Sequence, residues 1–203
     1  MKMDLKILLI SVLFIYCGNN LFAQIIKVDA IGITVKEMDR SIKFYQDVLG
    51  FKILSDNEYR GADYEKLNRV FGLNIRVVRM QLGEESIELI DYLTAGGRSI
   101  PEDQKSNDLF FQHIAIVVSD MEKAFEQLKK YNVEFVSTAP QTLPVSNIAA
   151  AGIKAFYFHD IDNHNLELIY FPKGKGNPKW QSSGNTIFLG IDHTAIGVSS
   201  TAN

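Results

Sequence analysis

The residues of this chain best suited to chemistry are histidines and glutamates at corresponding places in a repeated pattern. A phrase rich in β-branched residues recurs three times, at intervals of about 80 residues, and one of its positions holds Ala30, His113 and His193 in turn. A second phrase occurs twice and places Glu88 and Glu167 at equivalent positions. Imidazole nitrogens and carboxylate oxygens bind divalent metal ions, and a carboxylate can also act as a general base. The spacing therefore indicates a candidate catalytic or metal-binding site.

Each of these residues also has an ordinary structural interpretation. A glutamate in an alternating strand, such as Glu88 between Ile87 and Leu89, commonly faces solvent, and His113 could be a hydrogen-bonded histidine of the core. The repeat favours a functional role, because Glu88 and Glu167 would lie on quasi-symmetric strands and face each other across one concave surface. His113 would lie on the same surface. We therefore expect a shared polar site built from Glu88, His113 and Glu167.

The elements that must position these residues follow the same order in both copies. Each copy opens with a short strand, and apolar residues at three- and four-residue steps then predict a helix, at residues 37–49 and 120–131. A third segment, at residues 51–55 and 133–137, reads as a strand, and a hairpin closes each copy. The order predicts an α+β fold of two tandem βαβββ modules whose mixed sheets pair into a half-open cup.

The third copy of the opening phrase predicts the first strand of a further module that stops where its helix should begin. A lone strand without packing partners gains little stability. We therefore expect a truncated reading frame whose full form has four modules, with His193 in a second site. The expected organisation is a signal peptide at 1–23, a first module at 24–98, a linker at 99–110, a second module at 111–172, a connector at 173–187 and the truncated third module at 188–203.

The first 23 residues have the layout of a secretory signal peptide. Lys2 and Lys6 precede an apolar run at residues 7–17, and Ala23 is a small residue at the expected cleavage point before Gln24. The apolar run is too short to span a bilayer, which needs about 20 residues. The single cysteine of the chain lies in this segment. We therefore expect a periplasmic or secreted protein without a stable membrane anchor and, once processed, without a disulfide or a cysteine nucleophile.

The composition adds limits on the class of protein. An apolar fraction of 46% and a charged fraction of 22% are ordinary for a globular chain. The net charge of -3 gives no basic surface, so nucleic-acid binding has little support. Arg76 and Arg79 lie three residues apart on a predicted strand, so only one of them can face the cup. His159 and His164 flank a polar turn and are expected to face solvent.

Three segments carry a family resemblance. Residues 39–51, which read DRSIKFYQDVLGF, resemble the first helix of the vicinal oxygen chelate superfamily, which includes glyoxalases and extradiol dioxygenases. Residues 112–118 resemble the opening strand of the second module in that family, and residues 158–168 resemble its closing hairpin. The resemblance covers residues 25–172. It agrees with the module order that the repeat predicts.

The resemblance implies a divalent metal site formed by four positions, which in this chain hold Ala30, Glu88, His113 and Glu167. Three of them can bind a metal such as Zn, Fe, Mn, Ni or Co, whereas alanine cannot. The leading hypothesis is an exported metalloenzyme, a lyase, isomerase or dioxygenase, that acts on a small oxygen-rich substrate with Glu88 or Glu167 as general base. The alternative is a metal-free module that binds a small molecule, which the loss of a ligand at Ala30 favours.

Overall fold

A computed structural model describes residues 27–181 and 184–200 of the chain. The expected signal peptide, residues 1–23, lies outside these described residues. Within them, no helix has the length and apolar character needed to span a membrane.

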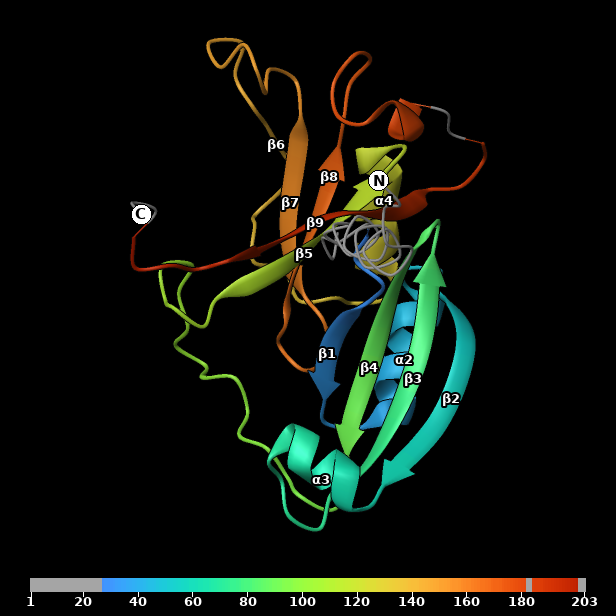
Figure 1. The fold of residues 1–203 in the computed structure, drawn as a ribbon. Coiled ribbons are helices and arrows are strands. Elements are labelled where there is room, and N and C mark those ends of the chain that lie inside the picture. Colours follow the sequence, from blue (N-terminus) through green and yellow to red (C-terminus); the bar gives the residue numbers. More distant parts are fainter. Residues whose placement is uncertain (1–26, 182–183, 201–203) are drawn as a thin grey trace, which may run out of the picture.

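The first module is a four-stranded mixed sheet with the strand order β1-β4-β3-β2 (Figure 1). Its elements are β1 (Ile31–Val35), α2 (Met38–Asp47), β2 (Lys52–Arg60), α3 (Ala62–Asn68), β3 (Asn74–Leu82) and β4 (Glu85–Tyr92). Strand β1 runs parallel to β4, whereas the other neighbours are antiparallel. Helix α2 buries Met38, Phe44 and Tyr45 against one face of the sheet, as its apolar periodicity predicts.

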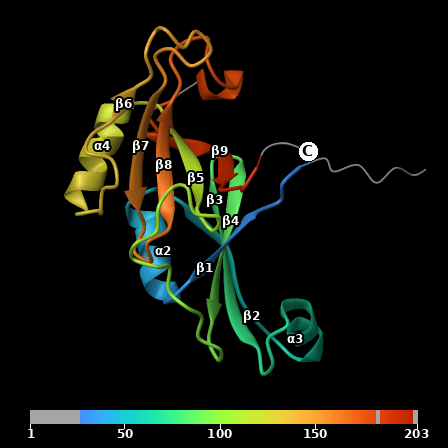
Figure 2. The same ribbon diagram turned by 90° about the vertical axis from the view of Figure 1, so that its left-hand side faces the viewer.

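The second module has an equivalent order with one additional strand, β6-β7-β8-β5-β9 (Figure 2). Its elements are β5 (Gln112–Val118), α4 (Met121–Lys130), β6 (Gln141–Thr142), β7 (Lys154–His159), β8 (Asn165–Tyr170), a 3-10 helix η1 (Pro178–Gln181) and β9 (Phe188–Ile196). The expected strand at residues 133–137 is reduced to one bridge, between Phe135 and Phe158. The segment is followed by Pro140, which cannot donate a hydrogen bond to a sheet.

Strand β9 is the main departure from the predicted architecture. It is not a lone strand, because it pairs antiparallel with β5 along the edge of the second sheet (Figure 1). Phe188 and Ile191 are buried in the core, and the backbone N–H of Ile191 donates to Glu85 Oε2 over 3.1 Å. Burial and a complete partner strand supply the stability that an isolated strand lacks.

The two faces of the second sheet differ in what they bury. Ile114 and Ile116 of β5 belong to the large core, which also contains residues of α2 and α4. Ala115 and Val117 alternate with them and pack with Trp180 in a smaller cluster on the other face. Since side chains of a strand alternate between faces, His113 lies on the same face as Ala115. This second face carries the candidate site.

Candidate metal centre

Three adjacent strands bring His113, Glu167 and His193 together. On β5, Ala115 is paired with Glu167 of β8 on one side and with His193 of β9 on the other. The three side chains offer ligand atoms that all lie within 4.8 Å of one another. His113 Nε2 is 3.1 Å from Glu167 Oε2, and His193 Nε2 is 3.7 Å from the same oxygen. The pairing therefore directs two imidazoles and one carboxylate toward one point.

The chemistry of His113 fits a metal ligand. Both of its ring nitrogens are buried and neither forms a hydrogen bond of good geometry within the described residues. Buried polar groups in proteins nearly always have partners, so this ring is an exception that needs a cause. The Glu167 side chain beside it is also buried, with 7% of its surface exposed. Two imidazoles and one carboxylate form a donor set that divalent transition metals accept while keeping coordination positions for water or substrate.

His193 is held by a second carboxylate. Its Nδ1 lies 2.9 Å from Asp192 Oδ2, and the other oxygen of Asp192 accepts a hydrogen bond of 2.9 Å from Trp180 Nε1. An ionised carboxylate can only accept, so it fixes the imidazole proton on Nδ1. Nε2, which faces Glu167, is then available as a ligand. Carboxylate–histidine pairs of this kind orient the ligands of many metal sites.

Tyr157 of β7 lies on the other side of Glu167. Its ring contacts the His113 ring edge to face, with the centroids 5.3 Å apart. Burial, the Glu167 charge and a hydrogen bond to Glu167 raise the pKa of Tyr157 to about 12. The phenol therefore keeps its proton at neutral pH and is a permanent hydrogen-bond donor at the site.

A cavity of about 710 Å³, which we name the sheet cavity, opens beside Tyr157. Phe111 and Val136 form its apolar part, and His159 and Asn165 lie in its polar part. His159 Nε2 is 3.2 Å from Asn165 Oδ1, which orients the amide. Among the described residues that line this cavity there is no lysine or arginine, whereas Glu102 and Glu134 both contribute. The lining of the sheet cavity is thus mixed and contains no lysine or arginine among the described residues.

The sequence-predicted residues divide between the two sheets. His113 and Glu167 lie together, but Glu88 is on the first sheet, paired directly with Arg79 across β3 and β4. Arg79 Nη1 is 3.3 Å from Glu88 Oε1 and 2.7 Å from Asp29 Oδ2. The group of possible ligands among the described residues does not include Glu88. The structure thus gives Glu88 an ion-pair partner and brings His193 to the place beside His113.

His193 was visible in the sequence as the third member of its repeated position, but sequence reasoning assigned it to another site. That assignment assumed that the third phrase begins a new module. The antiparallel pairing of β9 with β5 instead places His193 in the same group as His113 and Glu167. The recurrence of histidine at this position was the signal that could have identified it.

The sequence analysis expected His159 and His164, beside the polar turn before β8, to face solvent. Their side chains are instead mostly buried, with 18% and 20% exposed, and the turn is part of the junction between the modules. Asp160 is 4% exposed, accepts a 3.0 Å hydrogen bond from the Tyr45 hydroxyl of α2, and lies 2.8 Å from His164 Nδ1. Burial alone would raise the pKa of Asp160, but its bonds to His164 lower it overall. Burial likewise opposes the charge of His164, yet Asp160 raises the pKa of the imidazole. The hydrogen bond from Tyr45 to Asp160 joins the first module to the second.

The fold and the sequence together define the class of protein. The chain belongs to the Glyoxalase/Bleomycin resistance protein/Dioxygenase superfamily, which matches residues 27–168. It is similar to the protein YwbC of Bacillus subtilis (strain 168), with 25% identity over 144 residues that cover 70% of this chain and 95% of YwbC.

Solved structures of this superfamily share the fold. A glyoxalase family protein from Bacillus cereus superposes with a TM-score of 0.63 at 17% identity, over 74% of this chain and 97% of that one. A glyoxalase family protein from Enterococcus faecalis superposes with a TM-score of 0.52 at 22% identity, over 71% of this chain and 97% of that one. Two of the three grouped residues, His113 and Glu167, lie inside the matched region, whereas His193 lies beyond it.

Proposed function

We propose that this protein is a metal-dependent enzyme that acts on a small oxygen-rich molecule. We place this molecule in the sheet cavity, because Tyr157 lines the cavity and contacts the His113 ring. His113, Glu167 and His193 would hold a divalent ion such as Zn, Fe, Mn, Ni or Co. The observation that carries the proposal is the buried His113 ring, which makes no hydrogen bond in the described chain although it lies 3.1 Å from the Glu167 carboxylate. When bound, such an ion would supply Lewis-acid polarisation of two adjacent substrate oxygens.

The residues around this group would then divide the work of orientation and proton transfer. Asp192 keeps the His193 proton on Nδ1 and so directs Nε2 inward. Oε2 of Glu167 lies near both imidazoles. We therefore propose the other carboxylate oxygen of Glu167 as the general base that removes a proton beside a substrate carbonyl. Tyr157 remains protonated and can donate to Glu167 or to a substrate oxygen. We assign no such role to Glu88, because Arg79 engages it on the other sheet.

The lining of the sheet cavity supports a neutral substrate rather than an anionic one. An anion would meet Glu102 and Glu134 with no lysine or arginine among the described lining residues to offset the repulsion. Hydroxyl and carbonyl groups would instead find donors and acceptors in Tyr157, His159 and Asn165. We therefore propose a substrate that carries two adjacent oxygens and no negative charge.

We also propose that the protein is exported to the periplasm or beyond the cell. The support is the layout of residues 1–23, with Lys2 and Lys6 before an apolar run and Ala23 before Gln24. An exported chain that has lost its one cysteine would not depend on an intracellular thiol. This favours chemistry other than the thiol-dependent glyoxalase reaction.

A second candidate is a metal-free module that binds the same kind of molecule without reacting with it. The distance from His113 to Glu167 also suits a simple buried ion pair, and Ala30 offers no ligand from the first module. In that case the sheet cavity would still hold a ligand.

Elemental analysis after reconstitution separates the two candidates. The mature wild-type protein, the variant His193→Ala and the control His159→Ala would each be loaded with Zn, Mn, Ni or Co and desalted. The enzyme proposal expects stoichiometric metal in the wild type and in His159→Ala, and a loss in His193→Ala. Metal-free wild-type protein under all four conditions would contradict the enzyme proposal and support the binding module instead.

A further inference from the structure

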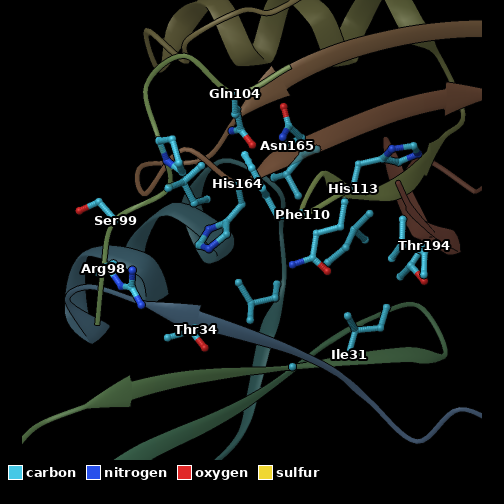
Figure 3. A pocket seen from close by; sticks show the side chains of 18 residues that line it. Ile31, Thr34, Arg98, Ser99, Gln104, Phe110, His113, His164, Asn165 and Thr194 are labelled. Atoms are coloured by element: carbon cyan, nitrogen blue, oxygen red, sulfur yellow. The ribbon is translucent and has the colours of Figure 1, made fainter. Parts of the chain in front are cut away.

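A second cavity, of about 430 Å³, lies where the two modules meet, and we name it the junction cavity (Figure 3). Strand β1 forms one wall, and the linker between the modules forms another. Pro101, Gln104 and Asn165 line both this cavity and the sheet cavity, so they form the partition between the two. A volume of this size lies within the range of small-molecule sites, about 300–1,000 Å³.

The junction cavity is apolar over most of its lining. Ile31 and Ile33 contribute from β1, Ile100 and Phe110 from the linker, and Leu166 from β8. Such a surface favours the hydrocarbon part of a ligand, because burial of apolar area contributes about 25 cal/mol per Å². Phe110, which lines this cavity, is 54% exposed. A ligand in this cavity would cover part of that surface.

The charge of the junction cavity is opposite to that of the sheet cavity. Arg98 lines it and makes no hydrogen bond or ion pair within the described residues. His164 lies on the same side of the space as Arg98 (Figure 3), and although burial opposes its charge, its bond to Asp160 raises the pKa of the imidazole. No aspartate or glutamate is among the described residues that line the cavity. An apolar space beside an unpaired guanidinium matches a molecule with an acidic head and a hydrocarbon body.

We propose that the junction cavity binds a small amphipathic monocarboxylate, with its carboxylate on Arg98 and its hydrocarbon part between β1 and the linker. Guanidinium and carboxylate groups match in geometry and form paired, charge-assisted hydrogen bonds. The apolar residues set the preference for a hydrocarbon chain over a compact polar acid. His113 also lines this cavity, so the site adjoins the proposed metal centre, but the proposal rests on Arg98 and the apolar lining and not on a bound metal.

Titration calorimetry with octanoate on the full mature protein tests the proposal. Octanamide has the same chain without the charge, and acetate has the charge without the chain. We expect saturable binding of octanoate and affinity at least about tenfold weaker for both analogues, equivalent to about 1.4 kcal/mol. The variant Arg98→Gln should bind octanoate with an affinity that is weaker than that of the wild type by a similar factor. The control Arg40→Gln, on the exposed face of α2, should bind octanoate as the wild type does.

A carboxylate could also bind a metal ion, so the test includes His193→Ala. Retention of octanoate binding in His193→Ala, together with its loss in Arg98→Gln, would support the junction cavity whatever the metal centre does. Binding that survives in Arg98→Gln, or that disappears in His193→Ala, would overturn the proposal. Equal affinities for octanoate and octanamide would also overturn it, as would no binding of octanoate.

Discussion

The substitution Asp192→Asn tests how strand β9 prepares His193 for metal binding. In the wild type, Asp192 accepts hydrogen bonds from two donors, the His193 imidazole and the Trp180 indole. An asparagine offers one accepting oxygen and one donating nitrogen. If the amide oxygen keeps the Trp180 bond, the amide nitrogen faces His193 Nδ1 and favours the tautomer with its proton on Nε2. That tautomer cannot present Nε2 as a ligand.

The expected cost follows from this geometry. Loss of a carboxylate that orients a ligand typically weakens metal binding by about 10–100-fold, which corresponds to about 1.4–2.8 kcal/mol. The effect on folding should be small, because the His193 side chain is 41% exposed and Asp192 is 26% exposed. The assay is competition of the protein with a chromogenic chelator for Zn at neutral pH, with the unfolding free energy measured in urea on the same samples.

A matched control shows whether the loss is local. Asp29→Asn removes a carboxylate that pairs with Arg79 on the first sheet, and it should leave Zn affinity unchanged. Wild-type Zn affinity in Asp192→Asn would refute the role of Asp192. Equal loss in both variants would show that the cause is the net charge rather than the orientation of His193.

Three further outcomes are expected. Glu88→Gln should leave the metal content unchanged, because Arg79 engages Glu88 on the first sheet, and metal loss by elemental analysis would return Glu88 to the site. The raised pKa of His164 means that its stabilising charge is fully present below the unfolded value of about 6.5 and is lost as the pH rises through the folded value. Urea unfolding should therefore give a lower stability at about pH 9 than at about pH 6, and this difference should be smaller in His164→Gln than in the wild type. The variant should also lose about 1.5–3 kcal/mol of unfolding free energy at the lower pH. Equal pH dependence in the two proteins would contradict the pairing. N-terminal sequencing of protein from the native host should begin at Gln24, whereas a chain that begins at Met1 would remove the case for export.

Local sequence patterns predicted the elements that form through local interactions. The helical periodicity at residues 37–49 corresponds to α2. Gly50 and Asn132, which directly follow the two predicted helices, both have positive φ, of 77° and 52°. Left-handed conformations of this kind end many helices and favour glycine or asparagine. The mixed α+β architecture is confirmed.

Long-range pairing could not be predicted in the same way. The sequence of β9 resembles the opening strand of a module, and that likeness says nothing of the direction in which the strand pairs or of its neighbour. Its antiparallel position beside β5 depends on the burial of its own Phe188 and Ile191 in the core and on the contact with Glu85, which is distant in sequence. The site on this sheet consequently contains His193, which the sequence analysis had assigned elsewhere.

The same limit applies to the polar residues. Glu88 and Glu167 are equivalent in the repeat, but the residue opposite Glu88 is Arg79, whereas the residue opposite Glu167 on β7 is Tyr157. A cation pairs with the first carboxylate, whereas a phenol donates a hydrogen bond to the second. Equivalent positions in a repeat thus acquire different chemistry from their cross-strand neighbours.

The most direct test of the metal centre is a crystal structure of the reconstituted protein with anomalous data collected on both sides of the absorption edge of the bound metal. We expect one strong anomalous peak in contact with His113 Nε2, His193 Nε2 and Glu167, at the usual ligand distances of about 2.0–2.2 Å. A peak bound elsewhere would contradict the account. So would metal-soaked crystals with no peak in which His113 and Glu167 remain in direct contact.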